Sequence, residues 1–132
     1  MIPDRIIEQG TLRTDGARAA VEVRIPWYRA LPGSCIAGAT LRIDGVDAPA
    51  ESLRWRMNDR EFTFAELVDE LEEWWFPADS AVLSGELPVA ADDADHEVEV
   101  GLQLYIPYII ISDSDVLRIE EHDRKTMKAV AA

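Results

Sequence analysis

The sequence lacks the residue clusters from which a self-contained catalytic or metal centre is usually built. Its 132 residues include one cysteine and two histidines, so neither an internal disulfide nor a Cys/His cluster with metal-ligand spacing is available. It contains no nucleophile elbow and no glycine-rich phosphate loop. The common motifs of serine hydrolases, nucleotide-binding proteins and structural zinc sites are therefore excluded.

Long hydrophobic runs are also missing. The isoleucine cluster at residues 109–111 is far shorter than the ~20 apolar residues that a membrane span requires. No basic segment precedes an apolar stretch near the N-terminus, so no signal peptide is predicted. Because the single Cys35 cannot form an internal disulfide, the sequence suits a reducing compartment. It predicts a cytoplasmic protein that does not enter a membrane.

Positive charge is absent from a large part of the chain. Between Glu61 and Leu117 there is no Lys or Arg but there are 15 acidic residues, and the whole chain has a net charge of −13. A nucleic-acid-binding surface is disfavoured, because phosphate binding requires clustered Lys and Arg. The acidic segment is interpreted either as a solubilising surface or as a face that matches a basic partner protein.

The chain instead contains an unusual apolar connection between strands. Apolar and charged residues alternate over residues 20–25, which indicates a strand with one buried face, and Pro26 ends it. The connection that follows is aromatic where most connections are polar: Trp27, Tyr28 and Arg29. The order Ile-Pro-aromatic recurs at residues 106–108, which end in Tyr108. These exits belong either to two similar core strands or to one shared aromatic surface.

Turn signals at regular spacing separate short segments of alternating hydrophobicity. The predicted strands cover residues 6–12, 19–26, 39–44, 46–49, 52–57, 61–64, 81–87 and 97–106, with a final hairpin at 116–120 and 124–130. Residues 6–12 and 19–26 are expected to form a hairpin. The pattern predicts one domain over residues 1–132, an antiparallel β-sandwich of jelly-roll type.

One segment changes to a helical period. Thr63 and Glu66 have the spacing of a capping box, which predicts a short α-helix at about 64–73. An apolar stripe at helical spacing is expected to face the core: Phe64, Leu67, Val68, Leu71 and Trp75. Trp74 cannot share that face with its neighbour Trp75, so it is predicted to point outward and Trp75 inward.

The remaining candidate groups have simple structural interpretations. His96 and His122 lie in acidic segments and are expected in solvated turns. The aspartates at 113 and 115 lack the glycine and final glutamate of a calcium loop. Cys35 has apolar neighbours and is predicted to be a buried structural residue.

Three sequence segments resemble the small (β) subunit of bacterial C-glycoside deglycosidases. They are VRIPWYRALPGSCI at residues 23–36, EWWF at 73–76 and YIPY at 105–108. The resemblance implies a non-catalytic, all-β subunit that supports a TIM-barrel α subunit. In that family the α subunit holds a divalent metal, often manganese, together with the catalytic groups. None of its metal ligands transfers to this chain.

The resemblance also implies the substrate and the reaction. The substrate is a 3-keto C-glycoside bound mainly by the partner, and its carbon–carbon glycosidic bond is cleaved by β-elimination. The accessory chain alone is then expected to be inactive and to hold no cofactor. The candidate partner-interface residues are Trp27, Tyr28, Arg29, Trp74, Phe76 and Tyr108, and the structural core residues are Cys35 and Trp75.

Two other classes of function remain compatible with the sequence. A carbohydrate-binding module could use Trp55, Trp74 and Trp75 as a platform on which sugar rings stack. A stand-alone enzyme could use His96 or His122. Binding of glycosides without a partner would favour the first, and activity of the purified chain would favour the second.

Overall fold

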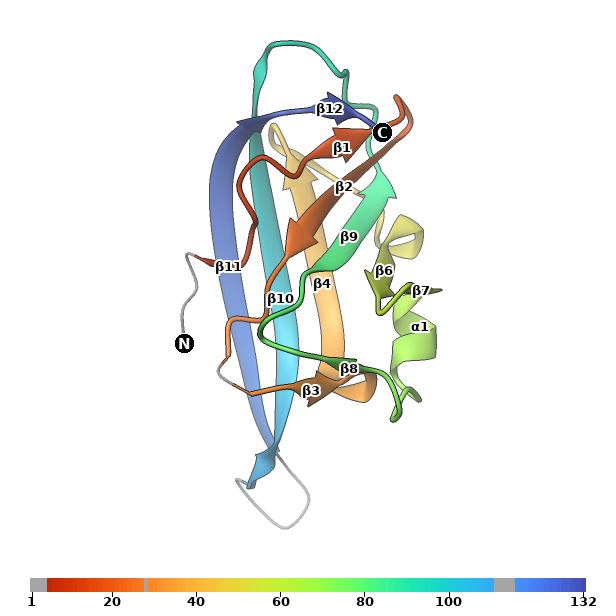
Figure 1. The fold of residues 1–132 in the computed structure, drawn as a ribbon, viewed down its shortest axis with the longest axis vertical. Coiled ribbons are helices and arrows are strands. Elements are labelled where there is room, and N and C mark those ends of the chain that lie inside the picture. The colour runs from red at the N-terminus through yellow and green to blue at the C-terminus, as the bar shows by residue number, and fades with distance from the viewer. Residues whose placement is uncertain (1–4, 28, 111–115) are drawn as a thin grey trace.

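Two β-sheets pack face to face, with a small third sheet at one end and a helix beside them (Figure 1). The computed structural model describes residues 5–27, 29–110 and 116–132, without the side chains of residues 107–110 and 116. The predicted class, an all-β sandwich with one short α-helix, is confirmed. No helix among the described residues is both long and apolar enough to cross a membrane.

The first sheet has six strands. In spatial order they are β12 (Val130–Ala131), β1 (Arg13–Thr14), β2 (Arg18–Val23), β9 (Ala81–Glu86), β6 (Arg54–Met57) and β7 (Arg60–Phe62). All neighbours are antiparallel except β1 and β12, which run parallel. A hairpin forms between β1 and β2, but its first strand lies just after the predicted one. The predicted strand at 6–12 does not form, since Ile7 makes only an isolated bridge to Val23.

The second sheet has four antiparallel strands. They are β11 (Val116–Lys128), β10 (Asp95–Ile110), β4 (Ile36–Ile43) and β5 (Val46–Asp47). The prediction of a final hairpin is wrong, because β11 continues unbroken along β10 from Lys128 to Leu117. Charged residues on the inward side of β11 interrupt its alternating apolar pattern, so the sequence does not show one continuous strand. One of them, Asp123, has a 5% exposed carboxylate that accepts a hydrogen bond from the Ile7 N–H at 2.9 Å.

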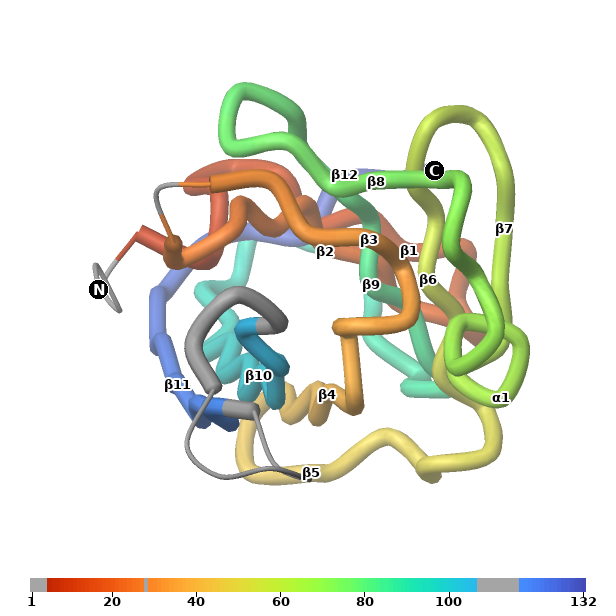
Figure 2. The backbone as a smooth tube through the Cα atoms, turned by 90° about the horizontal axis from the view of Figure 1, so that it is seen from below, coloured from red at the N-terminus to blue at the C-terminus, as the bar shows by residue number. Residues whose placement is uncertain are grey.

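The core fills the space between the sheets. Viewed from the lower end, β2 and β9 lie on one side of the molecule and β10 and β4 on the other (Figure 2). Alternate residues of β10 point inward, and those from Val98 to Ile106 are at most 1% exposed. A sandwich with a continuous core of this kind gives a rigid frame for the segments at its two ends.

The helix is shorter than predicted. Helix α1 (Phe64–Leu67) has four residues, and the predicted capping box is present: the Thr63 hydroxyl accepts from Glu66 N–H, and the Glu66 carboxylate accepts from Thr63 N–H. Beyond Val68 the chain leaves the helical path, because the carbonyls of Glu70 and Glu73 accept hydrogen bonds from another segment. The donors are the backbone N–H groups of Ser34 and Gly33, at 2.7 and 2.9 Å.

Candidate functional site

The lower end of the sandwich brings together two of the sequence segments predicted to be functional. Strands β3 (Leu31–Pro32) and β8 (Trp74–Trp75) pair there, side by side (Figures 1 and 2). The 3₁₀ turn η2 (Gly33–Cys35) follows β3. A second 3₁₀ turn, η3 (Ala50–Ser52), precedes β6 of the first sheet. Adjacent residues of a strand point to opposite faces, so Trp75 is 1% exposed and Trp74 is 40% exposed. The two tryptophans therefore have different environments.

An aromatic cluster lies beneath this end. The rings of Trp55 and Trp75 meet edge to face with centroids 4.8 Å apart, and Phe64 lies 6.0 Å from Trp55. The Trp75 indole N–H donates to the carbonyl of Asp79 at 3.1 Å. Because Trp55 is 0% exposed and Trp75 is 1% exposed, neither can stack on a sugar. The interpretation of Trp55, Trp74 and Trp75 as a joint carbohydrate platform is therefore wrong.

Four large apolar side chains, two of them aromatic, remain exposed on the same segment, and we call these four the aromatic patch. They are Val68, Leu71, Trp74 and Phe76, which are 62%, 69%, 40% and 48% exposed. The inward position predicted for Val68 and Leu71 is wrong, because it assumed a helix that continues to about residue 73, whereas α1 ends at Leu67. The acidic residues near 70–73, which no nearby cation in sequence compensates, were the signal against a long helix.

Acidic side chains surround the aromatic patch. Arg60 pairs with Glu70 and Glu73 at 3.2 and 3.4 Å, so those two charges are compensated. Three further acids are exposed and, within the described part of the chain, form no ion pair: Asp69, Glu72 and Asp79. The segment thus combines exposed apolar area with acidic side chains that form no ion pair with a described residue.

The other predicted interface residues differ in how much they expose. Trp27 is half-buried and packs against the core, and Arg29 is exposed. Tyr28 and the side chain of Tyr108 lie outside the described residues. Cys35 is 7% exposed, and burial raises the pKa of its thiol, so it is a poor nucleophile. Among the predicted interface residues whose side chains are described, the exposed large apolar ones are therefore Trp74 and Phe76.

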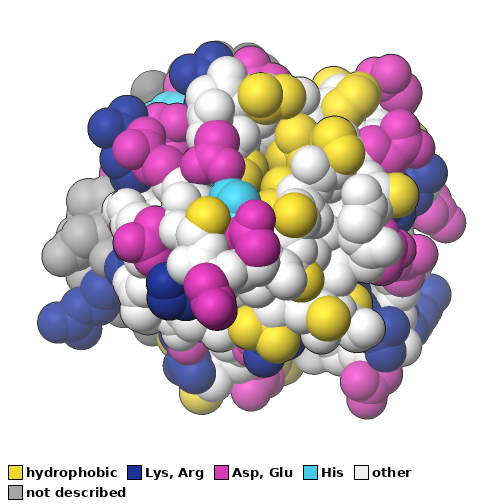
Figure 3. Space-filling model, turned by 90° about the horizontal axis from the view of Figure 1, so that it is seen from above, with side chains coloured by type: hydrophobic (Ala, Val, Ile, Leu, Met, Phe, Trp, Pro, Cys, Tyr) yellow, Lys and Arg dark blue, Asp and Glu magenta, His cyan; other side chains and the backbone are white. Residues whose placement is uncertain are grey.

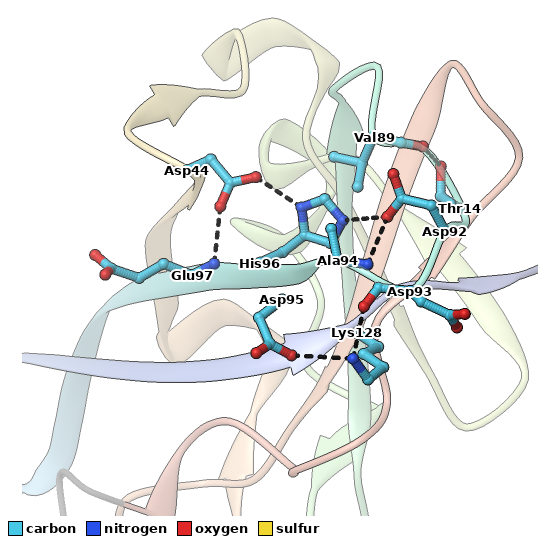
Figure 4. A network of polar contacts seen from close by, with 10 residues as sticks. All are labelled: Thr14, Asp44, Val89, Asp92, Asp93, Ala94, Asp95, His96, Glu97 and Lys128. Carbon is cyan, nitrogen blue, oxygen red and sulfur yellow. Dashed lines mark hydrogen bonds and ion pairs between the residues drawn. The ribbon is translucent and has the colours of Figure 1, made fainter.

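His96 is not in a solvated turn. It begins the inward-facing row of β10 and is 9% exposed (Figure 4). Its Nδ1 lies 2.7 Å from a carboxylate oxygen of Asp44, and its Nε2 lies 3.4 Å from Asp92, without the alignment of a hydrogen bond. The hydrogen bond to Asp44 raises the pKa of His96, and the same bond lowers the pKa of Asp44. Burial opposes the rise in the pKa of His96 without cancelling it.

The His96 network holds three segments together. Asp44 accepts a second hydrogen bond, from the Glu97 N–H at 2.9 Å, and Asp92 accepts one from the Ala94 N–H at 3.0 Å. Lys128 donates to the carbonyl of Asp93 at 2.6 Å. Figure 3 views this upper end and shows acidic side chains around a histidine, with hydrophobic side chains gathered beside it. The groups of this network are largely occupied by one another.

His122 also lies in a strand and not in a turn. It is on the outer face of β11, and its side chain is 68% exposed. It borders a hollow of about 710 Å³ beside β4 and β5, which Arg42 and Arg124 also line. Arg42 is already paired with Asp47 at 2.9 Å and Arg124 with Glu99 at 2.9 Å. The hollow therefore offers few charged groups for a ligand.

Among the residues that the structure describes, no group of three or more His, Cys, Asp or Glu side chains could hold a metal ion.

These features define a small β-sandwich protein with a group of exposed apolar side chains at its lower end. The family described as C-glycoside deglycosidase beta subunit matches residues 6–108, and the chain belongs to this family. It is 76% identical over 132 residues, the full length of both chains, to the "C-glycoside deglycosidase beta subunit" of Microbacterium trichothecenolyticum. It is 72% identical over 97% of both chains to the subunit of the same name from Arthrobacter globiformis.

A more distant relative carries a narrower name. The "3'-dehydrocarminate deglycosidase beta subunit" of a Microbacterium species is 36% identical over 128 residues, which are 96% of this chain and 95% of that one. The family resemblance predicted from residues 23–36, 73–76 and 105–108 is confirmed.

Proposed function

We propose that this chain is the non-catalytic β subunit of a metal-dependent C-glycoside deglycosidase and stabilises a TIM-barrel α subunit. The observation that carries the proposal is the family match over residues 6–108. The aromatic patch supports it, because an exposed apolar surface is expected on a chain that works in an assembly. The free thiol of Cys35 suits the reducing cytoplasm, which we propose as its location.

The proposed reaction follows from the chemistry of the substrate class. A C-glycoside has no leaving oxygen for an acid to protonate, so the usual two-carboxylate hydrolysis is poorly suited to it. A ketone at C3 of the sugar acidifies the proton on C2, which a base of the α subunit removes. The bond between C1 and the aglycone then breaks, its electron pair leaves with the aglycone carbon, and that carbon takes up a proton. The proposed enzyme is therefore a carbon–carbon lyase.

The metal is assigned to the α subunit in this proposal. A divalent metal such as manganese supplies electrostatic stabilisation of the enolate that forms when the C2 proton leaves. The role of the β subunit is to bind and support the barrel, and we propose that substrate contacts come mainly from the α subunit.

Reconstitution tests this function. The α subunit from the same genome and this chain are purified separately, mixed, and assayed for cleavage of a 3-keto C-glycoside. We expect cleavage by the mixture and none by this chain alone. Elemental analysis should find less than stoichiometric metal on this chain and about one divalent metal per α subunit. Cleavage by the β chain alone, or a failure of the two chains to associate, would refute the proposal.

A further inference from the structure

We propose that the aromatic patch, with the exposed acids Asp69 and Glu72 beside it, is the surface that docks onto the α subunit. The partner surface is then an apolar pocket rimmed by Lys or Arg. This inference rests on the proposed function and specifies which of the candidate interface residues carry the contact. It includes Val68 and Leu71 and assigns the largest contribution to Trp74.

The distribution of exposed apolar side chains supports this choice. Of the large hydrophobic residues exposed in the described chain, Val46, Tyr105 and Val130 lie on three different strands, whereas four lie between residues 68 and 76. Single exposed hydrophobic residues are ordinary on a protein surface, but a contiguous group is typical of an interaction site. Exposed aromatic side chains are enriched at the centre of protein interfaces.

The patch is held in place before any partner arrives. Trp74 donates its indole N–H to the Leu71 carbonyl at 3.1 Å, and its own carbonyl accepts from the Asn58 amide at 3.0 Å. The backbone bonds from Gly33 and Ser34 fix the segment between α1 and β8. A preorganised surface loses little conformational entropy on binding, so more of the contact free energy contributes to affinity.

The charges around the patch indicate what kind of surface it fits. Asp69 and Glu72 lie among the apolar side chains in sequence and form no ion pair with a described residue, whereas Asp79 shares a hollow with Arg56. Complementary charge at the rim speeds association and selects the partner. A second copy of this chain is disfavoured, because a symmetric dimer through the patch would place these acids against one another.

The test measures affinity for the purified α subunit by titration calorimetry at low and at physiological salt. Trp74→Ala should weaken binding about 30-fold, the fold-change equivalent to the ~2 kcal/mol of an interface hot spot. Val46→Ala, an exposed apolar residue on β5, is the matched control and should bind as the wild type does. Thermal melts of each free chain verify that the variants fold.

A second pair of variants tests the charge of the partner. Glu72→Lys should weaken binding several-fold at low salt, and the effect should shrink at physiological salt. Glu86→Lys makes the same change of charge at the end of β9 remote from the patch, and should have little effect. Equal effects of the two substitutions would show that only net charge matters and would overturn the assignment of a basic rim.

The outcomes separate the two proposals. If the wild type binds no α subunit, the proposed function fails and this inference fails with it. If the wild type binds and Trp74→Ala binds equally tightly, the function stands and the docking surface lies elsewhere. If the wild-type chain alone sediments as a dimer and Trp74→Ala converts it to a monomer, the patch is a self-association face and the inference is wrong.

Discussion

The two ends of the sandwich handle their exposed groups in opposite ways. At the upper end, the charged groups of His96, Asp44 and Lys128 form hydrogen bonds and ion pairs with neighbouring groups of the same chain. At the lower end, Trp74 and Phe76 remain exposed above an already complete aromatic core. The difference is that the polar groups of the upper end are bonded within the chain, whereas large aromatic side chains of the lower end remain exposed to solvent.

The same contrast applies within the lower end itself. Leu67 and Trp75 complete the core, at 0% and 1% exposure, while Leu71 and Trp74 lie close to them in sequence and face solvent. Residues of the first kind should determine the stability of the free chain, and those of the second kind should determine its assembly. Substitutions at the two kinds of position should separate these effects.

The largest effect is expected at Trp75. Trp75→Ala removes a fully buried aromatic ring and should lower the free energy of unfolding by about 3–5 kcal/mol. Trp74→Ala removes a ring that is 40% exposed and should cost less, about 1–2 kcal/mol. Urea denaturation of the two variants measures the difference.

The comparison between the two tryptophans has a clear failing result. Similar losses of stability would mean that Trp74 contributes to the core as much as Trp75 does, and the division of the lower end into a buried and an exposed face would then be mistaken. Phe76→Ala, at 48% exposure, is a second member of the exposed class and should resemble Trp74→Ala.

Much of the fold could be predicted from the sequence because its signals are local. The alternation in β2 and β10, the turn between β1 and β2, and the capping box at Thr63 each depend on a few neighbouring residues. The continuity of the final strand could not be predicted, because inward-facing Asp123 and Lys125 interrupt the apolar pattern. The Asp123 carboxylate is paired with Lys125 at 2.8 Å and accepts a hydrogen bond from the N–H of Ile7. That partner is remote in sequence.

The site was predictable to a similar degree. Adjacent residues point to opposite faces in a strand and about 100° apart in a helix, so Trp74 and Trp75 were expected to differ in direction in either structure. Val68 and Leu71 were assigned wrongly because the end of α1 is set by hydrogen bonds from Gly33 and Ser34. His96 was misjudged because Asp44 reaches it from another strand. Contacts between remote segments leave no local pattern to interpret.

The fit between η2 and the 64–73 segment gives the next prediction. A methyl group on Gly33 would lie 3.0 Å from Cβ and Cγ of Glu70 and 3.2 Å from Leu67. Gly33→Ala should therefore push this segment away and lower the free energy of unfolding by about 1–3 kcal/mol. Gly38→Ala, whose nearest neighbour is the end of the Gln103 side chain at 3.4 Å, is the control. An equal effect of both would contradict the tight packing inferred beneath the patch.

The helix cap should have a smaller effect. Thr63→Ala removes the hydroxyl that accepts from Glu66 N–H and should lower the free energy of unfolding by about 1 kcal/mol. Thr63→Ser retains the hydroxyl and should restore most of the loss. Chemical denaturation measures both. If Thr63→Ser is as unstable as Thr63→Ala, packing of the methyl group and not the cap would explain the effect.

The smallest effect, and the one specific to the upper end, is a pH dependence at His96. The pKa of His96 is raised in the folded state, so its contribution is fully present below the unfolded pKa of about 6.5 and is lost as pH rises through the folded value. The pKa of Asp44 is lowered, so its contribution to stability is lost as pH falls through its folded value.

His96→Gln retains polar atoms but cannot carry a charge. The melting temperature of wild type should therefore exceed that of His96→Gln most at about pH 5–6, and the difference should narrow by about pH 9. His122→Gln, which removes the exposed histidine on β11, is the control for the loss of a histidine. A difference that stays constant across this range would mean that the imidazole at position 96 is not held as a cation between Asp44 and Asp92.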